Sequence, residues 1–277
     1  MKFLSLSHLK DNITQLCKGI LQEEYQPLIP LKESYSKAIQ KIRGVACTPT
    51  LTIHFHTSDI AQEAIAQGVF SESANLSDIE SIQTESYKQH CRKLCEEAMT
   101  LISEHSAELY NLIDLVTTDV VFVHSPRVGG GSGSHLPGVV CISIDESWTS
   151  LDVANTLIHE STHLSTFICD MVNKIFSKPA SELDEDQYRV LSAVRVGDFR
   201  PLDKAVHSAF VTVPLLYFEQ LIGNDQMIKE FSHSLDDCVR GTLKQIDLFT
   251  PYGRALISSL AEFNENRDFS LVERAFD

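Results

Sequence analysis

The segment His159-Glu160-Ser161-Thr162-His163 constrains this chain most, because its HExxH spacing is typical of a metal-binding helix. Two histidines four residues apart lie on one face of a helix, so both imidazoles can reach one metal ion. Thr149 and Asp152 form a predicted capping box at the start of the helix. Apolar residues then follow at helical spacing, at Val153, Leu157, Leu164, Ile168 and Met171. The sequence therefore predicts a helix with one buried side and one metal-binding side.

The segments before this helix predict strands. Residues 120–123 and 138–144 are apolar runs typical of strands, and residues 51–56 alternate between apolar and polar side chains. The glycine- and serine-rich residues 125–134 predict a loop. Helical segments are expected near residues 6–22, 31–44, 58–67, 78–116, 186–195, 203–221, 225–246 and 251–264, of which 78–116 is long enough for two helices.

We therefore expect an α+β fold that is mostly helical, with a small β-sheet next to the HExxH metal-binding helix. The character of the sequence changes near residue 119. This change predicts a helical N-terminal lobe over 1–118 and a metal-binding catalytic lobe over 119–277, or one single domain.

Charge and cysteine content narrow the possible partners. The 277 residues carry a formal net charge of −15, which disfavours binding to nucleic acid or to an anionic membrane. No apolar run approaches the roughly 18 residues that span a bilayer. The seven cysteines are scattered and form no CxxC pair, which favours reduced thiols and a cytoplasmic location. The sequence leaves the oligomeric state open.

A catalytic metal site typically takes a third protein ligand, and the sequence offers several. The extended pattern HExxHxxGxxH fails, because Thr166 and Cys169 stand at its glycine and third-histidine positions. Glu182 and Glu185 lie at a plausible distance for a carboxylate ligand, although their acidic surroundings are typical of a solvated loop. His207 lies in an apolar helical segment, where a polar side chain needs a partner.

A weaker candidate pair lies earlier in the chain. His54 and His56 would point to the same side of the strand predicted at residues 51–56, where they could form a metal pair. A polar strand face is the commoner reason for such a pattern, so this pair ranks well below His159 and His163.

The order of motifs over residues 137–222 resembles a known family. A PGVV strand start at residues 137–140 is followed by HExxH, by Arg200-Pro201-Leu202, and by His207 in an apolar helix. This order is similar to that of the HEXXH-motif proteins associated with peptide natural-product clusters, although this chain has Ser208 where those proteins commonly have glycine. Members of that family are iron(II)- and 2-oxoglutarate-dependent peptide β-hydroxylases. The resemblance implies that this chain hydroxylates the β-carbon of a residue in a ribosomally synthesised precursor peptide.

The chemistry of such an enzyme assigns further residues. A non-haem iron oxygenase needs three ligands on one face of the metal, which His159, His163 and His207 could supply, and open positions for 2-oxoglutarate and O2. The distal carboxylate of 2-oxoglutarate needs an arginine, for which Arg200 is the first candidate and Arg195 and Arg127 come next.

A zinc metallopeptidase is the alternative. His159 and His163 would again bind the metal, with Glu182 or His207 as third ligand. Glu160 is the candidate catalytic residue in both readings. It would act as the general base of a peptidase, whereas in an oxygenase it would orient a metal-bound water, a ligand or the peptide.

Overall fold

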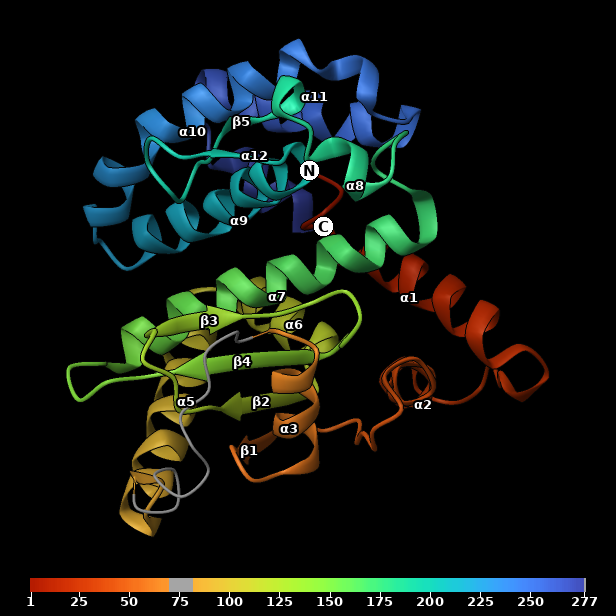
Figure 1. Cartoon of the computed structure of the whole chain (residues 1–277), viewed down its shortest axis with the longest axis vertical. Helices are drawn as coiled ribbons and strands as arrows, with labels where there is room; N and C mark the ends of the chain where they lie inside the picture. The colour runs from red at the N-terminus through yellow and green to blue at the C-terminus, as the bar shows by residue number, and fades with distance from the viewer. Residues whose placement is uncertain (70–81, 277) are drawn as a thin grey trace. The chain divides into compact units, whose positions relative to one another are not determined.

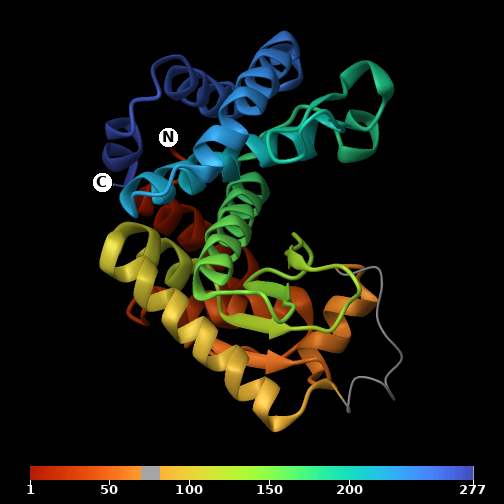
Figure 2. The same cartoon turned by 90° about the vertical axis from the view of Figure 1, so that its left-hand side faces the viewer.

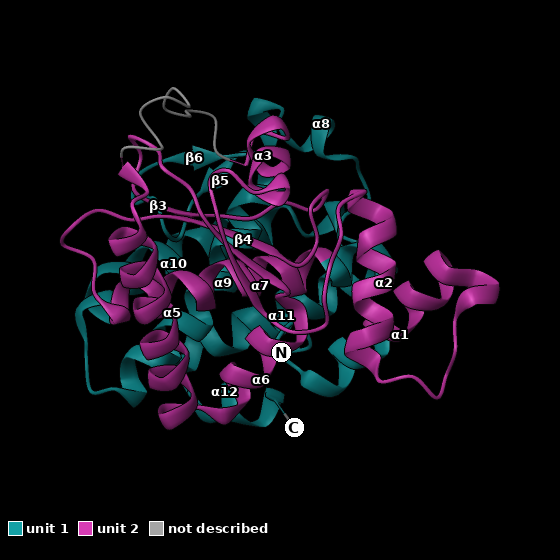
Figure 3. Cartoon of the chain, turned by 90° about the horizontal axis from the view of Figure 1, so that it is seen from below, with its two compact units in different colours: residues 1–12, 168–277 teal, residues 13–167 magenta. Residues whose placement is uncertain are grey.

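The structure is a computed structural model that describes residues 1–69 and 82–276, and it consists of two compact units (Figure 3). Unit 2 is formed by Ile13–Phe167, and unit 1 by Met1–Asn12 together with Ile168–Asp277. Helices predominate in both units, beside a four-stranded and a two-stranded sheet (Figure 1). The fold is therefore the mostly helical α+β type expected from the sequence.

The four-stranded sheet belongs to unit 2. Its strands are β1 (Thr52–Phe55), β2 (Asp119–Phe122), β3 (Gly129–Gly131) and β4 (Val139–Ser143), in the order β1-β2-β4-β3. β1 and β4 run parallel to β2, whereas β3 runs antiparallel to β4. The prediction of a loop over residues 125–134 is thus wrong at β3, which is an edge strand. The sequence predicts one lobe at residues 1–118, which contains β1, and a second at residues 119–277, which contains β2. That division into lobes stays a prediction.

Helices cover both faces of this sheet. Helix α3 (Asp59–Ala66) lies on one face, and α5 (Glu85–His105) and α6 (Ala107–Val116) lie on the other (Figures 1 and 2). A hydrophobic core lies between α3 and the sheet. It consists of Ile60, Ala61, Ala64, Val121, Val123, Leu136, Val139 and Cys141. On the α5 face, the rings of Phe55 and Phe122 stack 6.1 Å apart, and the Arg92 guanidinium lies 4.9 Å from the Phe55 ring centre.

The long helical segment predicted at 78–116 divides into two helices. Ser106 separates them, since α5 ends there and the Ser106 side chain accepts a hydrogen bond from the backbone N–H of Leu109 at the start of α6. Such a cap satisfies a backbone donor that has no partner within the helix. Residues 78–81 of the predicted segment lie outside the described residues.

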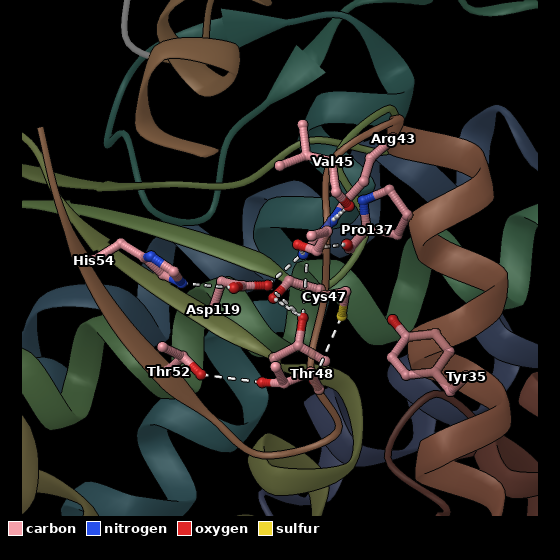
Figure 4. Close-up of polar contacts among 12 residues, drawn as sticks. Tyr35, Arg43, Val45, Cys47, Thr48, Thr52, His54, Asp119 and Pro137 are labelled. Atoms are coloured by element: carbon pink, nitrogen blue, oxygen red, sulfur yellow. Dashed lines mark hydrogen bonds and ion pairs between the residues drawn. The ribbon is translucent and has the colours of Figure 1, made fainter. Parts of the chain in front are cut away.

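A buried ion pair connects the end of helix α2 (Leu31–Arg43) to the sheet (Figure 4). Arg43 Nη1 lies 2.7 Å from Asp119 Oδ2, and the side chains are 0% and 4% exposed. The same guanidinium donates to the backbone oxygens of Val45 and Ala46. His54 Nε2 donates to the other Asp119 oxygen at 2.8 Å. Both oxygens of the buried carboxylate are therefore hydrogen-bonded, as burial of a charge requires.

The remaining elements complete the two units. Helices α1 (Leu6–Leu21) and α7 (Ser150–Asn173) contribute residues to both units, and the 3-10 helix η1 (Gln22–Glu24) belongs to unit 2. Unit 1 contains α8 (Ala180–Leu183), η2 (Asp186–Tyr188), β5 (Val190–Leu191), β6 (Phe199–Arg200), α9 (Leu202–Leu221), α10 (Gln226–Lys244), η3 (Ile246–Leu248), α11 (Pro251–Asn266) and α12 (Ser270–Phe276).

Helix α9 is the centre of unit 1 and is buried over nearly its whole length. The prediction of a helix over residues 186–195 is wrong beyond the short 3-10 helix η2, because β5 pairs there with β6 in an antiparallel hairpin. Gly197 has a φ of +84° in the turn of this hairpin, a backbone conformation that glycine adopts readily. Val190 is buried. A Cβ atom placed on Gly241 of α10 would lie 3.1 Å from the Val190 side chain. Val190 of β5 therefore packs closely against α10.

The seven cysteines are free thiols, and six of them are buried. Burial raises the pKa of Cys17 to about 11 and the pKa values of Cys95 and Cys238 to about 12. None of the helices within residues 1–69 and 82–276 combines the length and apolar character needed to cross a membrane.

Candidate metal centre

Helix α7 carries the HExxH segment, and its start is fixed by the predicted capping box. The backbone N–H of Thr149 donates to the Asp152 carboxylate at 2.8 Å, and the N–H of Asp152 faces the Thr149 hydroxyl at 3.4 Å. The predicted apolar positions are buried at Val153, Leu157, Leu164 and Ile168, but Met171 is 38% exposed. The prediction of a buried Met171 is therefore wrong, because the helix is less covered in its last turn.

Between residues 152 and 167, one stripe along α7 remains accessible to solvent while the other residues are buried. Its members are spaced three or four residues apart, at Asp152, Thr156, His159, His163 and Phe167. This spacing places them on one face of the helix. The two histidines therefore point in the same direction, and the ring of Phe167 stacks on His163 with ring centres 6.1 Å apart.

The histidine pair has the geometry of two ligands to one metal ion. The Nε2 atoms of His159 and His163 lie 3.2 Å apart. Two nitrogens bound to one metal at about 2.0–2.1 Å lie about 2.9–3.3 Å apart in octahedral or tetrahedral geometry. Burial lowers the pKa of His159 to about 4, so this imidazole is neutral near pH 7, as a ligand must be. The pair therefore fits iron(II) or zinc.

Glu160 lies beside this pair and is almost fully buried. Its Oε1 atom is 3.9 Å from His159 Nε2, and its Oε2 atom accepts a hydrogen bond of 2.7 Å from the Ser132 hydroxyl. Burial raises the pKa of Glu160 to about 7, against the opposing effect of the Ser132 hydrogen bond. A carboxyl group with this pKa can both accept and release a proton near neutral pH.

Strand β3 passes directly over this turn of α7. A Cβ atom at Gly130 would lie 2.6 Å from Thr156 Cγ2 and 2.8 Å from Glu160 Oε1. A side chain at this position would therefore force β3, Thr156 or Glu160 to shift. Sequence reasoning missed both β3 and Ser132 as parts of the site. The run Gly129-Gly130-Gly131 was the available signal, because glycine in a strand often marks the close approach of another segment.

The proposed third ligand His207 and the first candidate arginine Arg200 belong to unit 1. His207 lies in α9, five residues after the helix begins at Leu202, and is 8% exposed. Burial, assisted by the charge of Lys204, lowers the pKa of His207 to about 3, which leaves a neutral imidazole. Arg200 is half-buried in β6, directly before α9. The structure thus describes His207 and Arg200 separately from the histidine pair of unit 2.

Within unit 2, the structure brings His159 and His163 of the predicted ligand set together. Within residues 1–69 and 82–276, no group of three or more His, Cys, Asp or Glu side chains is arranged to hold a metal ion. Glu182 and Glu185 are exposed, with Glu182 paired to Lys178 at 2.8 Å and Glu185 hydrogen-bonded to Gln187.

The remaining candidates lie in two kinds of surroundings. Arg127 and Arg195 are exposed, Arg127 before β3 and Arg195 in the β5–β6 turn. His54 donates to Asp119, and His56 is buried with its Nδ1 atom 3.2 Å from the backbone N–H of His124. Both histidines therefore make contacts within unit 2, His54 from β1 and His56 from the position directly after it.

Comparison with known proteins adds no relative to this description. No protein-family model matches the chain, and no curated protein matches it. The site geometry and the sequence motifs are therefore the basis for the function proposed below.

Proposed function

We propose that the protein is an iron(II)- and 2-oxoglutarate-dependent dioxygenase that hydroxylates the β-carbon of a residue in a ribosomally synthesised precursor peptide. The observation that carries the proposal is the 3.2 Å separation of the His159 and His163 Nε2 atoms, which suits two ligands of one metal. The reaction consumes the peptide C–H bond, O2 and 2-oxoglutarate, and it yields the C–OH group, succinate and CO2. Bound iron(II) supplies the redox chemistry.

His207 is the proposed third ligand, and Arg200 the proposed partner of the distal carboxylate of 2-oxoglutarate. A buried, neutral imidazole is a suitable ligand, which supports the role of His207. A guanidinium binds a carboxylate through two parallel hydrogen bonds, which supports an arginine for the cosubstrate. Arg200 is half-buried, whereas Arg195 and Arg127 are exposed, and this difference favours Arg200.

The proposed peptide substrate lies in extended form along strand β3. Among the strands of residues 1–69 and 82–276, this one is at the edge of its sheet, with β4 on one side, and Gly130 is exposed. An edge strand can bind an extended peptide through main-chain hydrogen bonds. Because Gly130 lies next to Glu160, a peptide on this edge would pass close to the histidine pair.

The setting of the proposed reaction is the cytoplasm. Seven free thiols suit a reducing compartment, and a net charge of −15 disfavours nucleic acid as a partner. The proposed partner is therefore the precursor peptide and not a nucleic acid.

A zinc metallopeptidase is the second candidate, and one observation favours it. Glu160 has a pKa raised to about 7 and lies beside the histidine pair, which suits a general base that takes a proton from an attacking water. In that case Glu160 would be essential for cleavage, and 2-oxoglutarate would have no role.

Metal and product analysis separates the two candidates. The protein is purified without oxygen, its metal is quantified, and its absorbance is followed on addition of 2-oxoglutarate. A candidate precursor peptide is then incubated with iron(II), 2-oxoglutarate and 18O2, and analysed by mass spectrometry. We expect a new absorption band, succinate, and one 18O atom in the peptide. Bound zinc with cleavage of the peptide in the absence of 2-oxoglutarate would exclude the hydroxylase.

A further inference from the structure

The two oxygens of Glu160 have different surroundings. Oε2 accepts the hydrogen bond from Ser132 at 2.7 Å, whereas Oε1 lies 3.9 Å from His159 Nε2. A glutamate side chain has three rotatable bonds, and nothing in the HExxH spacing itself fixes the last of them. The hydrogen bond to Oε2 therefore determines which way the carboxylate plane turns and where Oε1 lies relative to the metal-binding nitrogens.

Ser132 is itself held by the sheet. It directly follows Gly131, which pairs with Cys141 in the central strand β4. The close approach of Gly130 to Thr156 and Glu160 leaves little room for β3 to shift toward α7. The serine hydroxyl is thus presented from a strand whose distance to the helix is fixed by packing.

Resting on the proposed function, we propose that Ser132 is a positioning residue that orients the Glu160 carboxylate beside the metal and couples it to the peptide-binding edge of β3. Ser132 does not touch the reacting atoms. It acts through Glu160, and it lies on the same segment that the extended peptide would contact. A peptide that pairs with Gly129–Gly131 would therefore bind to the segment that also carries Ser132. This one strand would position the reacting residue of the peptide and fix the orientation of the Glu160 carboxylate.

The kinetic test compares the Ser132→Ala, Ser132→Thr and Ser134→Ala variants. Loss of a hydrogen bond to a charged group is expected to lower kcat about tenfold in Ser132→Ala. Iron content and the KM for 2-oxoglutarate should stay within about twofold of wild type, and the ratio of hydroxylated peptide to succinate should fall. Ser132→Thr keeps the hydroxyl and should restore both kcat and this ratio. Ser134 is exposed on the same segment, so Ser134→Ala is the matched control with wild-type values.

An infrared measurement on the metal-free protein at one fixed pH tests the contact without any activity. The carboxyl band of Glu160 is assigned by its loss in Glu160→Gln, and it should shift in Ser132→Ala but not in Ser134→Ala. A band that stays in place, or a Ser132→Ala variant with wild-type kcat and product ratio, would overturn the inference. If the wild-type protein hydroxylates no peptide, the hydroxylase proposal fails while the infrared shift still supports the positioning of Glu160 by Ser132.

Discussion

The Arg43 guanidinium and the Asp119 carboxylate form an ion pair of 2.7 Å from which solvent is almost completely excluded. Removing one partner of a buried pair leaves the other charge uncompensated. We expect Asp119→Asn to lower the free energy of unfolding by about 3–5 kcal/mol at pH 7, measured by urea denaturation. The exposed pair of Lys37 and Glu33 is the control, since Glu33→Gln should lower the free energy of unfolding by no more than about 0.5 kcal/mol.

The effect of Asp119→Asn should also depend on pH. Burial alone would raise the pKa of Asp119, but the hydrogen bond from His54 and the charge of Arg43 hold it below its usual value. A carboxylate with a lowered folded-state pKa contributes stability above its unfolded pKa of about 3.9, and this stability is lost as the pH falls through the folded pKa. The difference between wild type and variant should therefore shrink below about pH 4. A difference that is constant down to pH 2.5 would contradict this assignment.

The three histidines proposed as ligands should each be required for metal binding. His159→Ala, His163→Ala and His207→Ala should each weaken iron(II) affinity by more than the roughly 10–100-fold typical of outer-shell changes, measured by calorimetry without oxygen. His90 is exposed on α5, so His90→Ala should bind iron(II) as the wild type does. Full activity of His207→Ala together with loss of activity in Glu182→Ala would instead favour the metallopeptidase.

Arg200→Ala should raise the apparent KM for 2-oxoglutarate tenfold or more. A lost charge-assisted hydrogen-bonded pair costs about 1.5–3 kcal/mol of binding free energy. Initial rates of succinate formation measure this constant, with Arg195→Ala and Arg127→Ala assayed in parallel. An unchanged KM in Arg200→Ala combined with a raised KM in one of the other two would move the carboxylate site to that arginine.

Glu160→Gln distinguishes the two proposed reactions. A neutral amide cannot take a proton from an attacking water, so a metallopeptidase would lose nearly all activity. The hydroxylase should keep its iron and still form succinate, with hydroxylation reduced if Glu160 orients the peptide. We expect measurable succinate from this variant. Cleavage of the peptide by the wild-type protein without 2-oxoglutarate, and its loss in Glu160→Gln, would support the peptidase.

Gly130→Ala should disturb the site through a steric conflict. The added methyl group would meet Thr156 Cγ2 at 2.6 Å and Glu160 Oε1 at 2.8 Å, so β3 or Glu160 must shift. We expect an overpacking loss of about 1–3 kcal/mol in the free energy of unfolding, together with lower turnover. Thr156→Ser removes the closest contact and should recover part of both. Gly19→Ala in α1 meets no atom within 4 Å and should not destabilise the protein.

Local sequence patterns were enough to predict helix α7, which carries the HExxH segment, and most of its neighbours. The capping box of Thr149 and Asp152 and the apolar spacing that follows depend on residues within a few turns of each other, and both appear in α7. The runs at 120–123 and 138–144 likewise identify β2 and β4, because buried strands are apolar throughout. The spacing of His159 and His163 places both side chains on one face of any helix.

Contacts between distant residues explain what the patterns missed. Three glycines carry no side-chain pattern, so β3 is a strand only because β4 offers a partner. The hydrogen bond of Ser132 to Glu160 spans 28 residues, and the ion pair of Arg43 and Asp119 spans 76. The segment 186–195 is helical by composition, yet pairing of Val190 with Arg200 makes part of it a strand. Tertiary packing overrides local propensity in each case.

The buried thiols can be used to measure local opening of the folded protein. Only a thiolate reacts readily with an alkylating reagent, and both burial and the raised pKa suppress that form in the folded chain. Cys141 lies in the central strand of unit 2, and Cys238 lies in helix α10 of unit 1. Their labelling rates therefore measure how often each of these two cysteines becomes exposed, and substrate or metal that stabilises one unit would slow the reaction of the cysteine in that unit.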